Sequence, residues 1–115
     1  MKNDLVPLHD ILKEIEFLHA IRDRTDLVGF KASPTDVRAS YSIMVISEAV
    51  RRIPEAWLDA QPEIPWQAIR GIGNKLRHEY QLISDVILWG VIAKHADALK
   101  RTIEVMLAKH GGSQA

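Results

Sequence analysis

The stretch of sequence that decides the fold is LVPLHDILKEIEFLHAI, residues 5–21. Its apolar side chains recur at steps of three and four residues, the spacing that places them on one face of a helix. These are Leu5, Leu8, Leu12, Ile15, Leu18 and Ile21. Pro7 fits such a helix only because it falls in the first turn. The pattern therefore predicts a helix from Leu5 to about Arg24, followed by a loop over residues 26–31.

Start signals predict three more helices. They are Ser33-Pro34-Thr35-Asp36, Pro65 and Ser84-Asp85, which open the second, third and fourth helices. The first of them is close to a capping box, since an acid follows the capping serine by three residues. The connection over residues 54–65 contains three prolines and has room for one short helical turn. No stretch alternates as a strand does, so the fold class is predicted to be all-α. The fourth helix would end at the glycines 111–112 and bury Leu88, Ile92, Leu99, Ile103 and Met106.

The second helix carries two apolar stripes. One consists of Ile43, Ile46, Val50 and Ile53, and the other of Val37, Tyr41, Met44 and Val45. A helix that is apolar on two sides is usually buried twice, so one face is expected to meet a second subunit. Glu48 falls on the second stripe. It either holds an arginine or His78 in a cleft, since an unpaired buried carboxylate is costly, or it is exposed and incidental.

Composition describes an ordinary globular chain. Of its 115 residues 47% are apolar, and 15 basic side chains balance 15 acidic ones. Bulk charge therefore does not indicate a nucleic-acid binder, and any such binding must come from a local patch. The chain has no cysteine, no apolar run at its start and no run long enough to span a membrane, so a cytoplasmic protein is expected. We expect a single domain over residues 1–112 with a frayed tail at 113–115.

The densest polar cluster is RGIGNKLRHEY, residues 70–80. A histidine can act as general base or acid near neutral pH, and an arginine can hold a phosphate, which together provide what metal-free RNA cleavage needs. The alternative is a solvated helix face with one incidental histidine, and periodicity does not separate the two. No histidine pair has the spacing of a helical zinc site, so no metal and no cofactor is predicted.

The residues around this cluster resemble a known family. They are Ile64-Pro65-Trp66, then Gly71-Ile72-Gly73-Asn74-Lys75-Leu76-Arg77-His78-Glu79-Tyr80, then Trp89. This run is similar to the signature of the HepT-like family of the HEPN superfamily, which has a proline-tryptophan helix start and a histidine, any residue and tyrosine at the end. Ser47-Glu48-Ala49 resembles the family's glycine-glutamate-alanine step. The likeness covers roughly residues 8–107.

The resemblance implies an antiparallel four- to five-helix HEPN-type bundle that forms a homodimer, with two copies of the motif facing each other across a composite cleft. It implies a metal-independent ribonuclease toxin that acts on RNA, possible targets being tRNA or mRNA. It also implies a partner, an MntA-like minimal nucleotidyltransferase antitoxin, which neutralises the toxin by transferring AMP to the motif tyrosine. That tyrosine corresponds to Tyr80.

One departure from the family pattern concerns the motif arginine. The family places it five positions before the histidine, where this chain has Gly73. The glycine is expected to leave open space, which Arg70 or Arg77, one turn away on either side, could fill to hold the phosphate. His78 would then be the general base or acid, Asn74 would orient the phosphate and Glu48 would support the site. The other hypothesis is a weakened, non-catalytic HEPN module that docks a nucleotidyltransferase or binds a nucleotide.

Overall fold

The structure, a computed structural model, describes residues 2–31, 35–78 and 83–111, and that part of the chain consists of helices and the short connections between them. Tyr80 and the tail at 113–115 lie outside the described residues. The elements are η1 (Lys2–Leu5), α1 (Val6–Arg24), α2 (Leu27–Lys31), α3 (Thr35–Arg51), α4 (Glu55–Asp59), α5 (Trp66–His78), α6 (Asp85–Gly90), the π-helical turn η3 (Val91–His95) and α7 (Ala96–His110).

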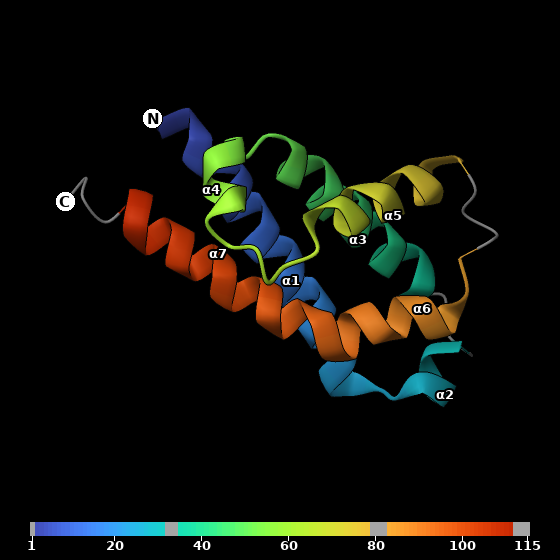
Figure 1. Cartoon of the computed structure of the whole chain (residues 1–115). Helices are drawn as coiled ribbons and strands as arrows, with labels where there is room; N and C mark the ends of the chain where they lie inside the picture. Colours follow the sequence, from blue (N-terminus) through green and yellow to red (C-terminus); the bar gives the residue numbers. More distant parts are fainter. Residues whose placement is uncertain (1, 32–34, 79–82, 112–115) are drawn as a thin grey trace.

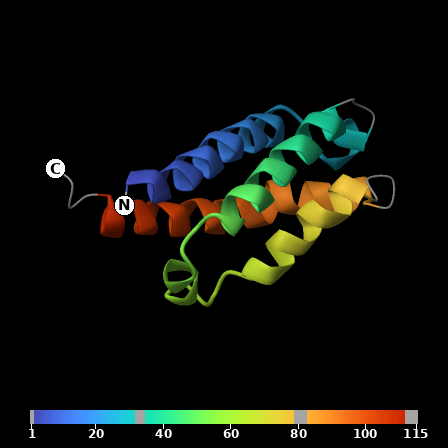
Figure 2. The same cartoon turned by 90° about the horizontal axis from the view of Figure 1, so that it is seen from above.

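The long helices run antiparallel to their neighbours in sequence. Figures 1 and 2 show α1 and α7 side by side, with the start of α1 and the end of α7 at the same end of the bundle. α3 packs against both α1 and α5, and α6 continues through η3 into α7. The prediction of an all-α, HEPN-type antiparallel bundle is thereby confirmed. No helix within the described residues is long and apolar enough to cross a membrane.

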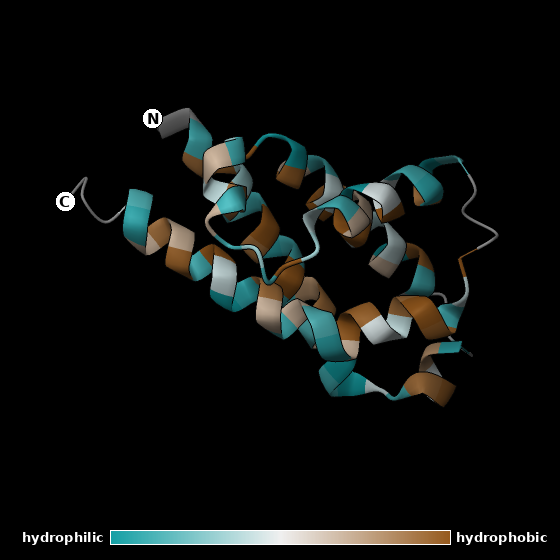
Figure 3. Ribbon diagram, in the orientation of Figure 1, coloured by the Kyte–Doolittle hydropathy of each residue, from teal (hydrophilic) through white to brown (hydrophobic). Residues whose placement is uncertain are grey.

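The core forms from the predicted stripes. Hydrophilic and hydrophobic positions alternate along α7, as expected of an amphipathic helix (Figure 3). The buried residues that the stripes predicted are Leu8, Ile15 and Leu18 of α1, Ile43, Ile46 and Val50 of α3, and Leu88, Ile92, Leu99, Ile103 and Met106 of α6–α7. Periodicity within each helix was therefore sufficient to find the inward faces.

The helix starts also follow the local sequence. Ser84 caps α6, and its hydroxyl accepts a hydrogen bond from the Ile87 N–H at 3.2 Å. Trp66, in the first turn of α5, is buried, and its indole N–H donates to the carbonyls of Leu58 and Gln61 at 3.1 and 3.0 Å. The α5 start is thus fixed against the proline-rich connection, which contains the short helix α4 as predicted.

The prediction of a loop over residues 26–31 is wrong. The segment forms the short helix α2, and its Phe30 is fully buried with its ring 5.5 Å from that of Trp89. A helix this short is not stable by itself and needs tertiary packing. Because the packing partner, Trp89, lies far along the chain, the five residues of α2 gave no local signal that they form a helix.

The outer stripe of α3 is left uncovered in one chain. Val37 and Tyr41 are 61% and 54% exposed, while Met44 and Val45 are half-buried. Arg38 follows Val37 on α3. Its guanidinium carbon lies 3.9 Å from the centre of the Phe17 ring of α1. The two stripes of α3 therefore have different environments, the inner one in the core and the outer one at the surface.

Polar contacts join the end of α1 to the start of α7. Arg22 donates to both carboxylate oxygens of Asp97 at 3.2 and 3.3 Å, and His19 Nε2 lies 2.9 Å from Asp97 Oδ1. Desolvation acts to raise the pKa of Asp97, but the hydrogen bonds and charge of Arg22, together with the charges of His19 and Arg101, outweigh it, so that pKa lies below its ordinary value. The pairing therefore joins the last turns of α1 to the first turn of α7.

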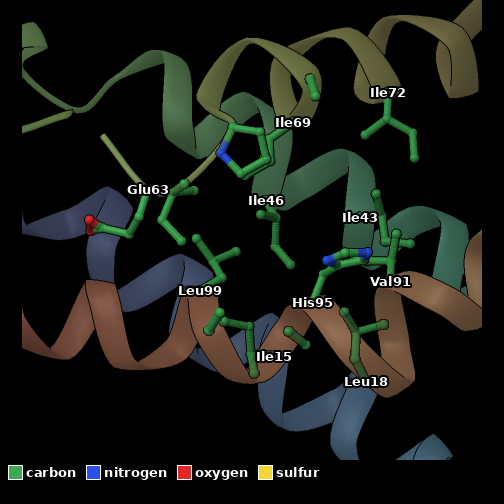
Figure 4. Close-up of a pocket in the computed structure, with 15 residues that line it drawn as sticks. Ile15, Leu18, Ile43, Ile46, Glu63, Ile69, Ile72, Val91, His95 and Leu99 are labelled. Carbon is green, nitrogen blue, oxygen red and sulfur yellow. The ribbon is translucent and has the colours of Figure 1, made fainter. Parts of the chain in front are cut away.

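A pocket of about 310 Å³ lies beneath α5 on the side away from its polar face. Figure 4 shows Ile69 and Ile72 of α5 above it and Leu99 and His95 of the α7 side below it. The π-helical turn contributes Val91 and His95 to the wall. Since space remains between α5 and α7 here, the position of α5 is set chiefly by its packing on α3, the helix that carries Glu48.

Candidate functional site

The polar face of α5 presents Arg70, Asn74 and Arg77, which follow one another at helical spacing. Asn74 and Arg77 are in contact, since the Arg77 Nη2 donates to the Asn74 side-chain oxygen at 3.1 Å. Both are exposed and lie in the last turns of the helix. This contact holds the guanidinium along the helix, toward Asn74. His78 is next in sequence and ends the helix.

Glu48 of α3 faces this end of α5. Its Oε1 lies 2.6 Å from Arg77 Nη1, and its Oε2 lies 3.8 Å from Arg51 Nε. The Glu48 side chain is 46% exposed, so the carboxylate is paired but not buried. Each of the two interpretations offered above thus matches one observation: the carboxylate is half-exposed, and it pairs with an arginine, Arg77.

Arg70 lies at the other end of the polar face. Its guanidinium is 3.5 Å from the Glu55 carboxylate of α4, and its side chain is 24% exposed. Eight residues separate Arg70 from His78, which is about 12 Å along a helix axis. The structure therefore brings Arg77, and not Arg70, into one cluster with Asn74 and Glu48.

The expectation of open space at Gly73 is wrong. Gly73 is buried where α5 crosses α3, and a Cβ built on it would overlap both Oγ and Cβ of Ser47 and lie 3.8 Å from Ser47 Cα. Neither Arg70 nor Arg77 can fill this position, because Ser47 already fills it. The glycine thus permits a close helix crossing, which position within the motif could not reveal.

His78 is the last residue of α5, and its side chain is exposed. The imidazole lies next in sequence to Arg77. Tyr80, the predicted AMP acceptor, lies outside the described residues. No group of three or more His, Cys, Asp or Glu side chains suited to a metal occurs within the described ranges.

Ser47 is the residue of this region that sequence reasoning missed. Its side chain is fully buried, and its hydroxyl donates to the Arg70 carbonyl oxygen at 3.2 Å. Arg51 Nη2 donates to the same carbonyl at 3.3 Å. The sequence did contain one signal for this contact. Position 47 is serine where the resembled family has glycine, and position 73 is glycine where the family has arginine.

Comparison with known proteins supports the resemblance. The family model described as ribonuclease HepT-like matches residues 11–106. A protein of Caldanaerobacter subterraneus subsp. tengcongensis, provisionally named as an RNase, is 32% identical over 110 residues, which are 95% of this chain and 98% of that protein. A Methanocaldococcus jannaschii protein with the same kind of provisional name is 30% identical over 74% of this chain and 71% of its own length.

A third relative, from Thermococcus cleftensis, is provisionally named ribonuclease HepT. It is 28% identical over 101 residues, covering 84% of this chain and 89% of that protein. No solved structure gave a significant match. The family match covers most of the bundle, including α5 and the part of α3 that carries Glu48. The chain therefore belongs to the HepT-like ribonuclease family.

Proposed function

We propose that this protein is a metal-independent endoribonuclease toxin whose site is built around His78 and Arg77. The observation that carries the proposal is the cluster at the end of α5, where Arg77 is held by Glu48 at 2.6 Å and by Asn74 at 3.1 Å. The exposed His78 follows Arg77 in sequence, and the chain belongs to a ribonuclease family. RNA as substrate and the absence of cysteine both fit a cytoplasmic site of action.

The chemistry would be attack of a ribose 2′-hydroxyl on the adjacent phosphorus. His78 takes the hydroxyl proton as the oxygen–phosphorus bond forms, or gives a proton to the 5′-oxygen as its bond to phosphorus breaks. The products are a 2′,3′-cyclic phosphate and a 5′-hydroxyl end. In a dimer, the two copies of His78 facing each other across the composite cleft would share these two steps.

Arg77 would stabilise the charge that develops on the phosphate. A guanidinium carries five N–H donors, of which the contacts with Glu48 and Asn74 engage only part. It can thus remain held by these residues and still donate to a phosphate oxygen. Glu48 fixes the arginine in place, and Asn74 would add an orienting hydrogen bond, so the cation is positioned before RNA arrives.

Regulation is proposed to come from an MntA-like minimal nucleotidyltransferase that transfers AMP to Tyr80. Tyr80 follows His78 by two residues. An added AMP group there would bring a second phosphate and a bulky base next to the site. It would compete with RNA for Arg77 and block access to His78.

Metal independence gives the direct test of this function. We expect the purified protein to cleave single-stranded RNA in the presence of excess EDTA, because His78 and Arg77 supply the proton transfer and the charge stabilisation. The measurement is product formation on a gel, with end analysis for the cyclic phosphate. Cleavage that disappears with EDTA and returns with Mg²⁺ would contradict the proposal.

The composite cleft requires a homodimer, and the exposed outer stripe of α3 supports one. We expect light scattering at micromolar concentration to give twice the 13.0 kDa of one chain. Val37→Glu should shift the mass toward the monomer, because it places a charge in the stripe that a partner would cover. Val105→Glu on α7 is the matched control, since Val105 is also about half exposed but lies on another helix. If Val37→Glu kept the mass of a dimer, as Val105→Glu should, this face would be excluded as the interface.

A second candidate function is a non-catalytic module that docks a nucleotidyltransferase or binds a nucleotide. The observation in its favour is the buried contact between Gly73 and Ser47, which leaves no cation at the position where the family motif has one. Wild-type protein that cleaves RNA no faster than a His78→Ala variant would support this alternative.

A further inference from the structure

The crossing of α3 and α5 has room for a side chain on only one of the two helices. Ser47 is fully buried there, and Gly73 lies directly opposite it. A Cβ on Gly73 would overlap two side-chain atoms of Ser47 and would also lie 3.8 Å from its Cα, which is in ordinary contact. The obstruction thus comes from the serine side chain alone, while the backbone of α3 leaves space for a methyl group.

We infer that Ser47 and Gly73 form a coupled pair, and that Ser47 is the residue which keeps position 73 closed to a cation. The effect of this pair on RNA cleavage rests on the proposed function. The coupling of Ser47 and Gly73 in packing depends only on the geometry of the crossing.

The geometry indicates where an arginine at position 73 would go once Ser47 is removed. Its Cβ would point at position 47 of α3, which precedes Glu48 in sequence. The Glu48 side chain is 46% exposed and forms ion pairs with Arg77 and Arg51. Position 73 also precedes Arg77 by four residues, so the two side chains would be neighbours on the helix surface. The new guanidinium would therefore reach the same cluster through a space that Ser47 now occupies.

Removing the serine hydroxyl does not leave its acceptor unpaired. The Arg70 carbonyl receives hydrogen bonds from both Ser47 Oγ and Arg51 Nη2, at 3.2 and 3.3 Å. In a Ser47→Gly variant the second of these remains. The loss at position 47 is therefore mainly a loss of packing, which a side chain at position 73 can replace.

A thermal double-mutant cycle tests the packing part. Gly73→Ala alone should lower the melting temperature by about 5–15 °C, because it overpacks the crossing. In a Ser47→Gly background the same change should cause no loss. Gly71→Ala is the matched control on the same helix, since nothing lies within 4 Å of a Cβ there, and alanine should be neutral or stabilising at that position. Gly73→Ala as stable as Gly71→Ala, or an equal loss in both backgrounds, would overturn the inference.

An activity arm tests the role in the site. Gly73→Arg alone should be destabilised, and the double variant Ser47→Gly/Gly73→Arg should fold and cleave RNA in EDTA about a hundredfold faster than wild type. Adding His78→Ala to the double variant should remove that gain, which a purely structural rescue would not explain. Gly73→Arg with full stability and the same gain would show that Ser47 does not close the position. A coupled thermal cycle without cleavage in any variant would support the packing pair and contradict the ribonuclease function.

Discussion

Replacing His78 with alanine is expected to lower the rate of RNA cleavage by on the order of a hundredfold or more, the scale typical of losing a general acid or base. The imidazole is exposed at the end of α5, so its removal takes away the proton-transfer group without leaving a hole in the core. Rates should be compared at saturating RNA in EDTA. His9→Ala is the control, since His9 is exposed on α1 outside the α5 cluster.

The same assay distinguishes the two arginines. Arg77→Ala should cost a factor similar to that of His78→Ala, because Arg77 is the cation held by Glu48 and Asn74 and precedes the histidine in sequence. Arg70→Ala should cost much less, since Arg70 contacts Glu55 and starts about 12 Å further along the helix. Arg77→Lys should recover only part of the rate, because an ammonium lacks the planar fork that binds phosphate and carboxylate together.

An Arg70→Ala loss as large as that of Arg77→Ala would mean that the phosphate binds along the whole polar face. Cleavage that neither substitution reduces would exclude both arginines as phosphate ligands. Circular dichroism of each variant should match wild type, since all of these side chains are exposed or partly exposed.

Tyr80→Phe is expected to abolish AMP transfer completely. Only the hydroxyl is removed, which is the group that would carry the AMP, so the fold should be unaffected. The wild-type chain, a nucleotidyltransferase of the MntA-like class and ATP should give an AMP-sized mass increase on a peptide that contains residue 80. Tyr41→Phe is the control, because Tyr41 is 54% exposed on α3. The assignment fails if the mass increase persists in Tyr80→Phe or maps to Tyr41.

Modification should also switch off cleavage. Wild-type protein treated with the nucleotidyltransferase and ATP should lose RNA cleavage in proportion to the fraction modified, while treated Tyr80→Phe should keep it. Loss of cleavage in treated Tyr80→Phe would point to inhibition by docking alone.

The sequence alone determined the features that depend on neighbouring residues. The stripe from Leu8 to Leu18 gave the buried face of α1, and Ser84 and Pro65 marked the starts of α6 and α5. Each signal acts within one or two helical turns, because periodicity, capping and proline geometry involve residues less than about eight positions apart. The densest part of the family motif was visible for the same reason, since residues 70–78 lie within a single helix.

Tertiary structure decided the features that depend on two helices at once. These include the helix at 27–31 around Phe30, the π-helical turn at 91–95, and the pairing of Arg77 with Glu48 while Arg70 turns to Glu55. It also decided that Gly73 marks a close contact and not an empty space. Ser47 and Gly73 are 26 positions apart, and whether their side chains compete depends on the distance and register of α3 and α5. Those quantities arise from the packing of the whole bundle, which no local pattern encodes.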